Sequence, residues 1–207
     1  MSLFETEQRQ AKTTRILVYP NITFAKDLEK DSYIQVIKKQ ITLLNEIRDD
    51  LWFYLILPKE VPSLVFDNVT QLIVYLPTHS PTMRAHFDTE AIKKVLPREY
   101  DFDLVMCHLP EHAYDLKNVL YNKTQHVPKF FGYAHWFDFK EVVNWPMDSF
   151  NKSMIGLLEY DKCYINTQHQ KEMVLKQAEE IFNSDTLYKL SNILEVQHIG
   201  VDSKDIV

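Results

Sequence analysis

Seven short apolar segments recur along the chain and constrain its fold more than any other feature. They are residues 15–19 (RILVY), 51–57 (LWFYLIL), 72–76 (LIVYL), 104–107 (LVMC), 129–133 (KFFGY), 162–165 (KCYI) and 194–198 (LEVQH). Most are continuously apolar, which is typical of strands buried on both faces of a parallel sheet. Helix-like segments separate them. The sequence therefore predicts an α/β fold, a Rossmann-like parallel sheet of about seven strands with helices on both faces.

The segments between the strands carry apolar residues at helical spacing. Helices are expected at residues 32–48, 89–96, 148–158 and 168–182, and a further one begins at Pro110. Their core-facing side chains are expected to be Ile34, Ile37, Ile41, Leu44, Ala113, Leu116, Val119, Leu120, Val174, Ala178 and Ile181. Residues 1–14 are expected to be a frayed tail, and residues 15–207 a single domain.

Charge and composition exclude several classes of function. The net charge of −6 is spread along the chain without a basic block, so no nucleic-acid surface is expected. No transmembrane segment is expected either, because no apolar stretch reaches bilayer length. Cys107 and Cys163 lie inside strand-like runs and are expected to be buried free thiols. These features favour a cytoplasmic protein.

Only three glycines occur, at Gly132, Gly156 and Gly200. The dinucleotide motif G-x-G-x-x-G needs three glycines in one turn, and the phosphate loop needs two followed by a lysine. Neither motif is present, which disfavours the usual dinucleotide and nucleoside-triphosphate enzymes. The nucleophile elbow G-x-S-x-G is also absent, which disfavours a small hydrolase as the function.

Polar residues follow the predicted strands, where ligands of open parallel sheets bind. The candidates for ligand contact are Asn21, His108, Glu111, His135, Trp136, Asp138 and Thr167. Histidine serves as a general acid or base near neutral pH and donates hydrogen bonds to hydroxyls and phosphates. Aromatic side chains such as Trp136 stack on sugars and bases, although many in residues 130–139 are expected to be core.

Three other motifs point to chemistry that the local structure disfavours. Residues 108–112 (HLPEH) match the spacing H-x-x-E-H of a zinc protease, but a helix beginning at Pro110 would exclude His108, so no metal site is predicted. A Cys107–His108 thiol pair is disfavoured because adjacent strand residues point to opposite faces. Glu172 and Glu180 have the spacing E-x7-E, but they are expected on a solvated helix face.

Taken in order, four segments resemble the N-terminal domain of GT-B glycosyltransferases, in particular the retaining, glycogen-synthase-like branch called family four. They are residues 103–108 (DLVMCH), 132–135 (GYAH), 160–168 (YDKCYINTQ) and 193–202 (ILEVQHIGVD). The loop after the first strand lacks the glycines that the family often places there. Thr167 stands where serine is common.

The resemblance implies an acceptor-binding domain that acts with a C-terminal donor domain, absent from these 207 residues. The donor would be a nucleotide-sugar, with no tightly bound cofactor, and the partners would be a small-molecule or glycan acceptor. His135 would position the transferred sugar as the catalytic residue. His108 and Glu111 would line the acceptor side, and Asn21 would lie near the donor phosphates.

Two hypotheses about the function remain open. The chain is either half of a glycosyltransferase, inactive by itself, or a standalone Rossmann-like module that binds a nucleotide or sugar without catalysis. In the first case, an exposed cleft face would also favour self-association.

Overall fold

A computed structural model of the chain describes residues 13–20, 32–59, 66–75, 87–97, 101–124, 126–134, 137 and 148–198. These residues form one seven-stranded sheet in the order β3-β2-β1-β4-β5-β6-β7, and every neighbouring pair is parallel. The strands are β1 (Thr14–Tyr19), β2 (Leu51–Pro58), β3 (Val69–Val74), β4 (Leu104–Cys107), β5 (Lys129–Ala134), β6 (Lys162–Ile165) and β7 (Leu194–Val196). The predicted α/β, Rossmann-like fold is confirmed.

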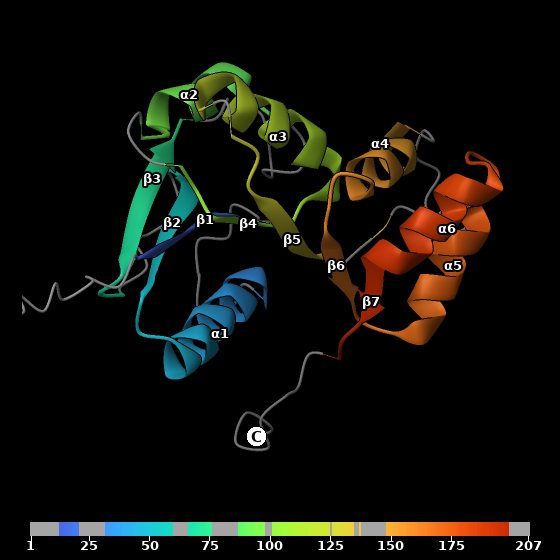
Figure 1. Cartoon of the computed structure of the whole chain (residues 1–207), viewed down its shortest axis with the longest axis horizontal. Coiled ribbons are helices and arrows are strands. Elements are labelled where there is room, and N and C mark those ends of the chain that lie inside the picture. Colours follow the sequence, from blue (N-terminus) through green and yellow to red (C-terminus); the bar gives the residue numbers. More distant parts are fainter. Residues whose placement is uncertain are drawn as a thin grey trace, which may run out of the picture.

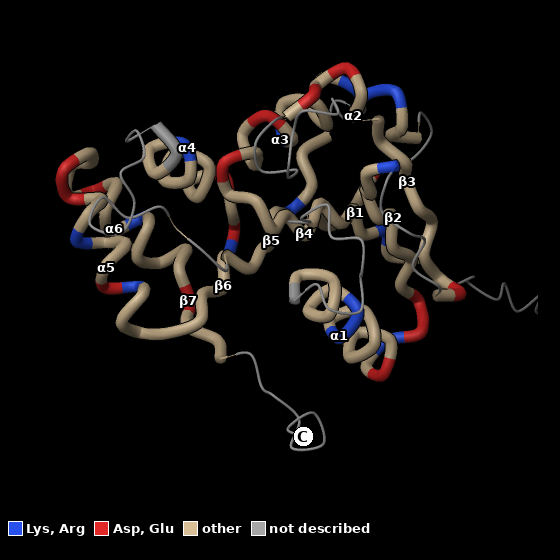
Figure 2. The backbone as a smooth tube through the Cα atoms, turned by 180° about the vertical axis from the view of Figure 1, so that it is seen from behind, with Lys and Arg blue, Asp and Glu red and all other residues tan. Residues whose placement is uncertain are grey.

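Helices lie on both sides of the sheet, with α1 on one side and α2, α3 and α4 on the other (Figure 1). They are α1 (Ser32–Ile47), α2 (Thr89–Val95), α3 (Pro110–Thr124), α4 (Asp148–Leu157), α5 (Gln168–Ala178) and α6 (Ser184–Ile193). Acidic and basic residues are scattered over these helices and do not form one basic face (Figure 2). Within the described ranges, no helix has the length and hydropathy that crossing a bilayer would require.

Short polar side chains fix where three of the helices begin. Asp88 accepts a hydrogen bond from the backbone of Ala91 at 2.9 Å and caps α2. Thr167 caps α5 in the same way, and Asn183 caps α6. Each cap satisfies a backbone N–H that the first helical turn would leave without a partner.

The core contains most of the residues that the sequence predicts. Ile34, Ile37 and Ile41 of α1 are buried, as are the four expected residues of α3 and both cysteines, which are free thiols. Leu44 is half-buried. The single core therefore joins helices from both sides to the sheet.

Three details of the prediction are wrong. β3 begins at Val69 and ends at Val74, so it is shifted from the predicted residues 72–76. The helix expected to reach Phe182 ends at Ala178, and a separate helix, α6, follows it. Ile181 lies in the turn between the two helices and is 36% exposed, because Phe182 rather than Ile181 packs on the core.

Two glycines permit backbone contacts that fix the beginning of α3. A Cβ atom on Gly132 of β5 would lie 2.0 Å from the carbonyl oxygen of Cys107 and 2.5 Å from the ring of Tyr160. The Tyr160 hydroxyl passes over this position and donates to the same carbonyl oxygen at 2.8 Å. A Cβ atom on Gly156 of α4 would lie 1.7 Å from the carbonyl oxygen of Pro110. Both strand β5 and helix α4 thus approach the β4–α3 connection closely.

Replacing Gly132 by alanine should destabilise the fold strongly. The new methyl group meets backbone on one side and a buried ring on the other, so β4, β5 or Tyr160 must move, at a cost of about 3 kcal/mol. Urea unfolding of Gly132→Ala measures this loss. Lys152→Ala, at an exposed position of α4, is the control and should change the free energy of unfolding by less than about 0.5 kcal/mol. Equal stability of the two variants would contradict the close approach.

Candidate functional site

The strand order reverses between β1 and β4, and this switch point is where open parallel sheets bind ligands. Tyr19 is the last residue of β1 and is the register partner of Cys107 at the end of β4. The backbone N–H of His108 donates to the carbonyl oxygen of Tyr19 at 2.9 Å, which extends the ladder by one bond. The two strands therefore place His108 and Tyr19 at the carboxyl edge of the sheet.

A buried aromatic cluster lies beside this switch point. The hydroxyl of Tyr19 and Nδ1 of His112 are 3.0 Å apart and share a hydrogen bond, and both side chains are buried. Phe87 packs against both rings, with centroid distances of 6.0 Å to Tyr19 and 5.4 Å to His112. The cluster joins the end of β1 to the first turn of α3 and to the residue just before the α2 cap.

Electrostatics keep the Tyr19 hydroxyl protonated. Burial raises the pKa of Tyr19 well above its usual value, and negative charge at Cys107, Asp115 and Glu111 would raise it further. The hydroxyl is therefore a neutral hydrogen-bonding group at physiological pH. It orients the imidazole of His112 and carries no charge of its own.

Two predicted site residues lie together at the beginning of α3. His108 follows β4 and is only 3% exposed, and Glu111 is half-buried in the first helical turn. Pro110 begins the helix, as predicted, so His108 precedes it and does not share a helical face with His112. No group of three potential metal-binding side chains occurs within the described part of the chain.

Thr167 lies at the end of β6, on the same edge but beyond β5. Its side chain is exposed, and its hydroxyl accepts a hydrogen bond from the backbone of Gln170 at 3.0 Å. Nearby, the Tyr133 hydroxyl contacts the Asn166 side chain and lies 2.8 Å from the Gln197 carbonyl oxygen. These contacts tie the ends of β5, β6 and β7 together, and Thr167 serves at least as a helix cap.

Four predicted site residues lie outside the described residues: Asn21, His135, Trp136 and Asp138. The junction at Gly200 and Asp202 does so too. The described edge therefore consists of three parts, namely the aromatic cluster, the His108–Glu111 pair and the Thr167 cap.

Sequence reasoning missed Tyr19 and Phe87. The sequence places Tyr19 in a strand, and only the side-by-side placement of β1 and β4 brings it to His112, 93 residues later. An aromatic residue directly before the cap Asp88 was the available signal for Phe87, since a residue at this position often packs against the helix that follows.

Comparison of the chain with models of protein families finds no match, and comparison with curated proteins finds none either.

The two cysteines should be unreactive in the native protein. Both side chains are fully buried, and burial raises the pKa of the Cys107 thiol to about 12. This shift alone lowers its thiolate fraction at pH 8 about a thousandfold relative to an ordinary thiol. Titration with an aromatic disulfide reagent should therefore detect both thiols quickly in urea and neither in buffer. Rapid labelling of Cys107 in the folded chain would instead support the hypothesis that Cys107 acts as a nucleophile.

Proposed function

We propose that this chain is the acceptor-binding domain of a glycosyltransferase that moves a sugar from a nucleotide-sugar to an acceptor. One observation carries the proposal. Two of the segments that resemble the family end at the same sheet edge, since residues 103–108 run along β4 to His108 and residues 160–168 run along β6 to the α5 cap. The order of the motifs and the geometry of the sheet thus agree.

Side chains at the beginning of α3 suit an acceptor rich in hydroxyl groups. The Glu111 carboxylate accepts hydrogen bonds from hydroxyls, and a histidine such as His108 donates or accepts them. Burial strengthens these contacts because water competes less. In this proposal, His108 and Glu111 line the acceptor side, while Thr167, Trp136 and Asp138 border the cleft.

The transfer step would depend on residues on both sides of a cleft. His135 would position the transferred sugar, and Asn21 would lie near the donor phosphates; both roles rest on the resemblance. A C-terminal donor domain would stabilise the charge that develops on the leaving diphosphate. The donor is a substrate, so the proposal requires no tightly bound cofactor. Two free buried thiols fit a reducing compartment such as the cytoplasm.

A second candidate function is a Rossmann-like module that binds a nucleotide or a sugar without catalysis. The switch point supports it, because this position binds ligands in open parallel sheets whether or not chemistry follows. A glycosyltransferase domain and a sugar-binding module would both bind a saccharide at His108 and Glu111, whereas a nucleotide-binding module would not. Only the glycosyltransferase domain would support sugar transfer once it is joined to a donor domain.

Glu111→Gln should weaken saccharide binding about tenfold, because it removes a charge-assisted hydrogen bond. Amide chemical shifts of the labelled chain, titrated with a panel of oligosaccharides and with UDP- and GDP-sugars, measure binding. Asp115→Asn, an exposed carboxylate one turn further along α3, is the matched control and should bind as the parent does. Binding of nucleotide-sugars alone would favour the module, and a panel without any binder would contradict both functions.

His135→Ala should lower kcat for sugar transfer at least about a hundredfold in a protein that joins this domain to a donor domain. The KM for the donor should change less, because the imidazole acts mainly on the transferred sugar. His169→Ala, at an exposed position of α5, is the control. A transfer rate that survives His135→Ala unchanged would remove the catalytic role of His135.

A further inference from the structure

A side chain from β5 holds the backbone at the carboxyl end of β7. Tyr133 of β5 is buried, and its hydroxyl donates a hydrogen bond to the carbonyl oxygen of Gln197 at 2.8 Å. Strands β5 and β7 are not neighbours, because β6 lies between them. The side chain of Tyr133 therefore reaches past one strand to the residue that follows the next.

The same hydroxyl also contacts the residue that follows β6. It touches the side chain of Asn166, and the backbone N–H of Asn166 donates to the side-chain oxygen of Gln170 at 3.2 Å, in the first turn of α5. Asn166 directly precedes Thr167, the residue that caps this helix. One phenol thus joins the ends of three neighbouring strands and contacts the residue beside a predicted site residue.

Burial keeps the Tyr133 hydroxyl available as a donor, because it raises the pKa of Tyr133 to about 12. The group therefore keeps its proton at physiological pH. Gln197, in contrast, is an exposed residue, so water can take the place of the hydroxyl at its carbonyl oxygen. Loss of the hydroxyl should consequently loosen the end of β7 without unfolding the domain.

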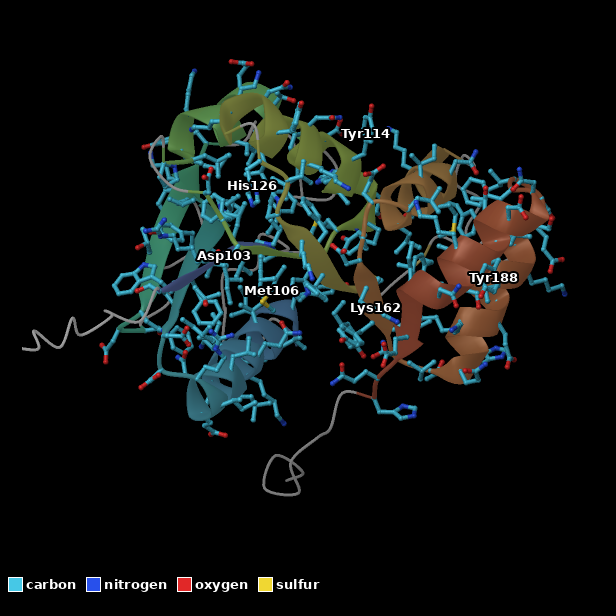
Figure 3. The ribbon with its side chains drawn as sticks, in the orientation of Figure 1. Asp103, Met106, Tyr114, His126, Lys162 and Tyr188 are labelled. Carbon is cyan, nitrogen blue, oxygen red and sulfur yellow. The ribbon has the colours of Figure 1, made fainter. Side chains whose placement is uncertain are left out.

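Other contacts hold the beginning of β7 and do not involve Tyr133. The ammonium group of Lys171 in α5 donates to the carbonyl oxygen of Leu194 at 2.7 Å. Lys162 at the start of β6 pairs with Glu195 at 3.4 Å, and Figure 3 shows Lys162 beside β7. The two ends of this three-residue strand are thus fixed by different side chains.

The end of β7 depends on two hydrogen bonds of Gln197 among the described residues. Its backbone N–H donates to the carbonyl oxygen of Ile165 at 2.9 Å, and its carbonyl oxygen accepts from Tyr133. Both bonds lie beyond Val196, the last residue of the strand. Together they fix the point at which the chain leaves the sheet.

We infer that Tyr133 is a positioning residue for sugar transfer, an inference that rests on the proposed function. In that function, His135 follows directly after the end of β5 at Ala134, and the donor domain follows β7. The hydroxyl of Tyr133 sets the exit from β7 relative to the end of β5, and so sets where the donor domain begins relative to His135. Tyr133 touches no substrate itself. A misplacement of about 1 Å between reacting groups costs up to about a hundredfold in rate, so such a contact matters to catalysis.

Hydrogen exchange of the whole chain tests the contact without any ligand. Tyr133→Phe removes the hydroxyl and keeps the ring, so the amide of Gln197 should exchange at least about tenfold faster, because the end of β7 opens more often. The amide of Leu194, which donates to Leu190 in α6, should exchange as before.

Tyr164→Phe is the matched control for the exchange experiment. Tyr164 is the register partner of Tyr133 in β6, and its hydroxyl takes no part in these contacts. This variant should leave exchange at Gln197 unchanged. Exchange at Gln197 that is also unchanged in Tyr133→Phe would overturn the inference, whatever the chain's function.

Kinetics of a protein that joins this domain to a donor domain test the role in transfer. Tyr133→Phe should lower kcat about tenfold and change the KM of either substrate less than about twofold, because both substrates still bind but meet His135 less often in the productive geometry. Tyr164→Phe should keep the parent kcat.

The two experiments separate the failure of this inference from the failure of the proposed function. Faster exchange at Gln197 together with an unchanged kcat in Tyr133→Phe would overturn the positioning role alone. A joined parent protein that transfers no sugar would overturn the proposed function, and with it the role of Tyr133 in transfer. The exchange result would still stand in that case, because it involves neither a donor nor an acceptor.

Discussion

The hydrogen bond from the Tyr160 hydroxyl to the carbonyl oxygen of Cys107 organises much of this structure. The β4–β5 register pairing stops at Met106 and Phe131, one residue before Cys107. The phenol occupies the space above Gly132 and donates to the carbonyl oxygen just beyond the last paired residue. Burial raises the pKa of Tyr160 well above its usual value, so the donor keeps its proton throughout the physiological range. The end of β4, and with it the direction in which α3 begins, depends on this bond.

Two of the three glycines serve this arrangement, which explains why a chain so poor in glycine keeps them. Gly132 lets the phenol pass over β5, and Gly156 lets α4 approach the first turn of α3. About two turns further along α3, Lys117 pairs with Glu159 at 2.9 Å and ties the helix to the segment before β6. The scarcity of glycine that excludes phosphate loops therefore coexists with a backbone packed tightly where His108 and Glu111 lie. Such rigidity would preorganise the side chains that the proposed function assigns to a hydroxyl-rich acceptor.

The sequence predicts most helices and strands well, but it predicts poorly which side chains from different elements contact each other. The reasons are physical. Continuous apolar runs predict the strands, because a strand buried on both faces needs apolar side chains on both. The helix that begins at Pro110 is predictable because proline fits the first turn of a helix. The end of α5 depends on which of Ile181 and Phe182 reaches the core, and periodicity treats the two alike. The bond between Tyr19 and His112 depends on β1 lying next to β4, a pairing that neither segment encodes by itself. Of the predicted site residues, His108 and Glu111 come together because four residues of sequence already join them.

The reversal of strand order between β1 and β4 also divides the described helices between the two sides of the sheet. From β1 the chain winds one way to β2 and β3 and then returns to continue through β4 to β7, so the right-handed crossovers change sides at that point. Among the described residues, α1 lies on one side of the sheet and α2, α3 and α4 lie on the other. Val18 is buried and Met106 only half-buried because this boundary falls between β1 and β4. The two flanks of α1 differ accordingly, since Asn45 bonds to Asn68 just before β3, whereas Leu43 and Ile47 are exposed apolar side chains.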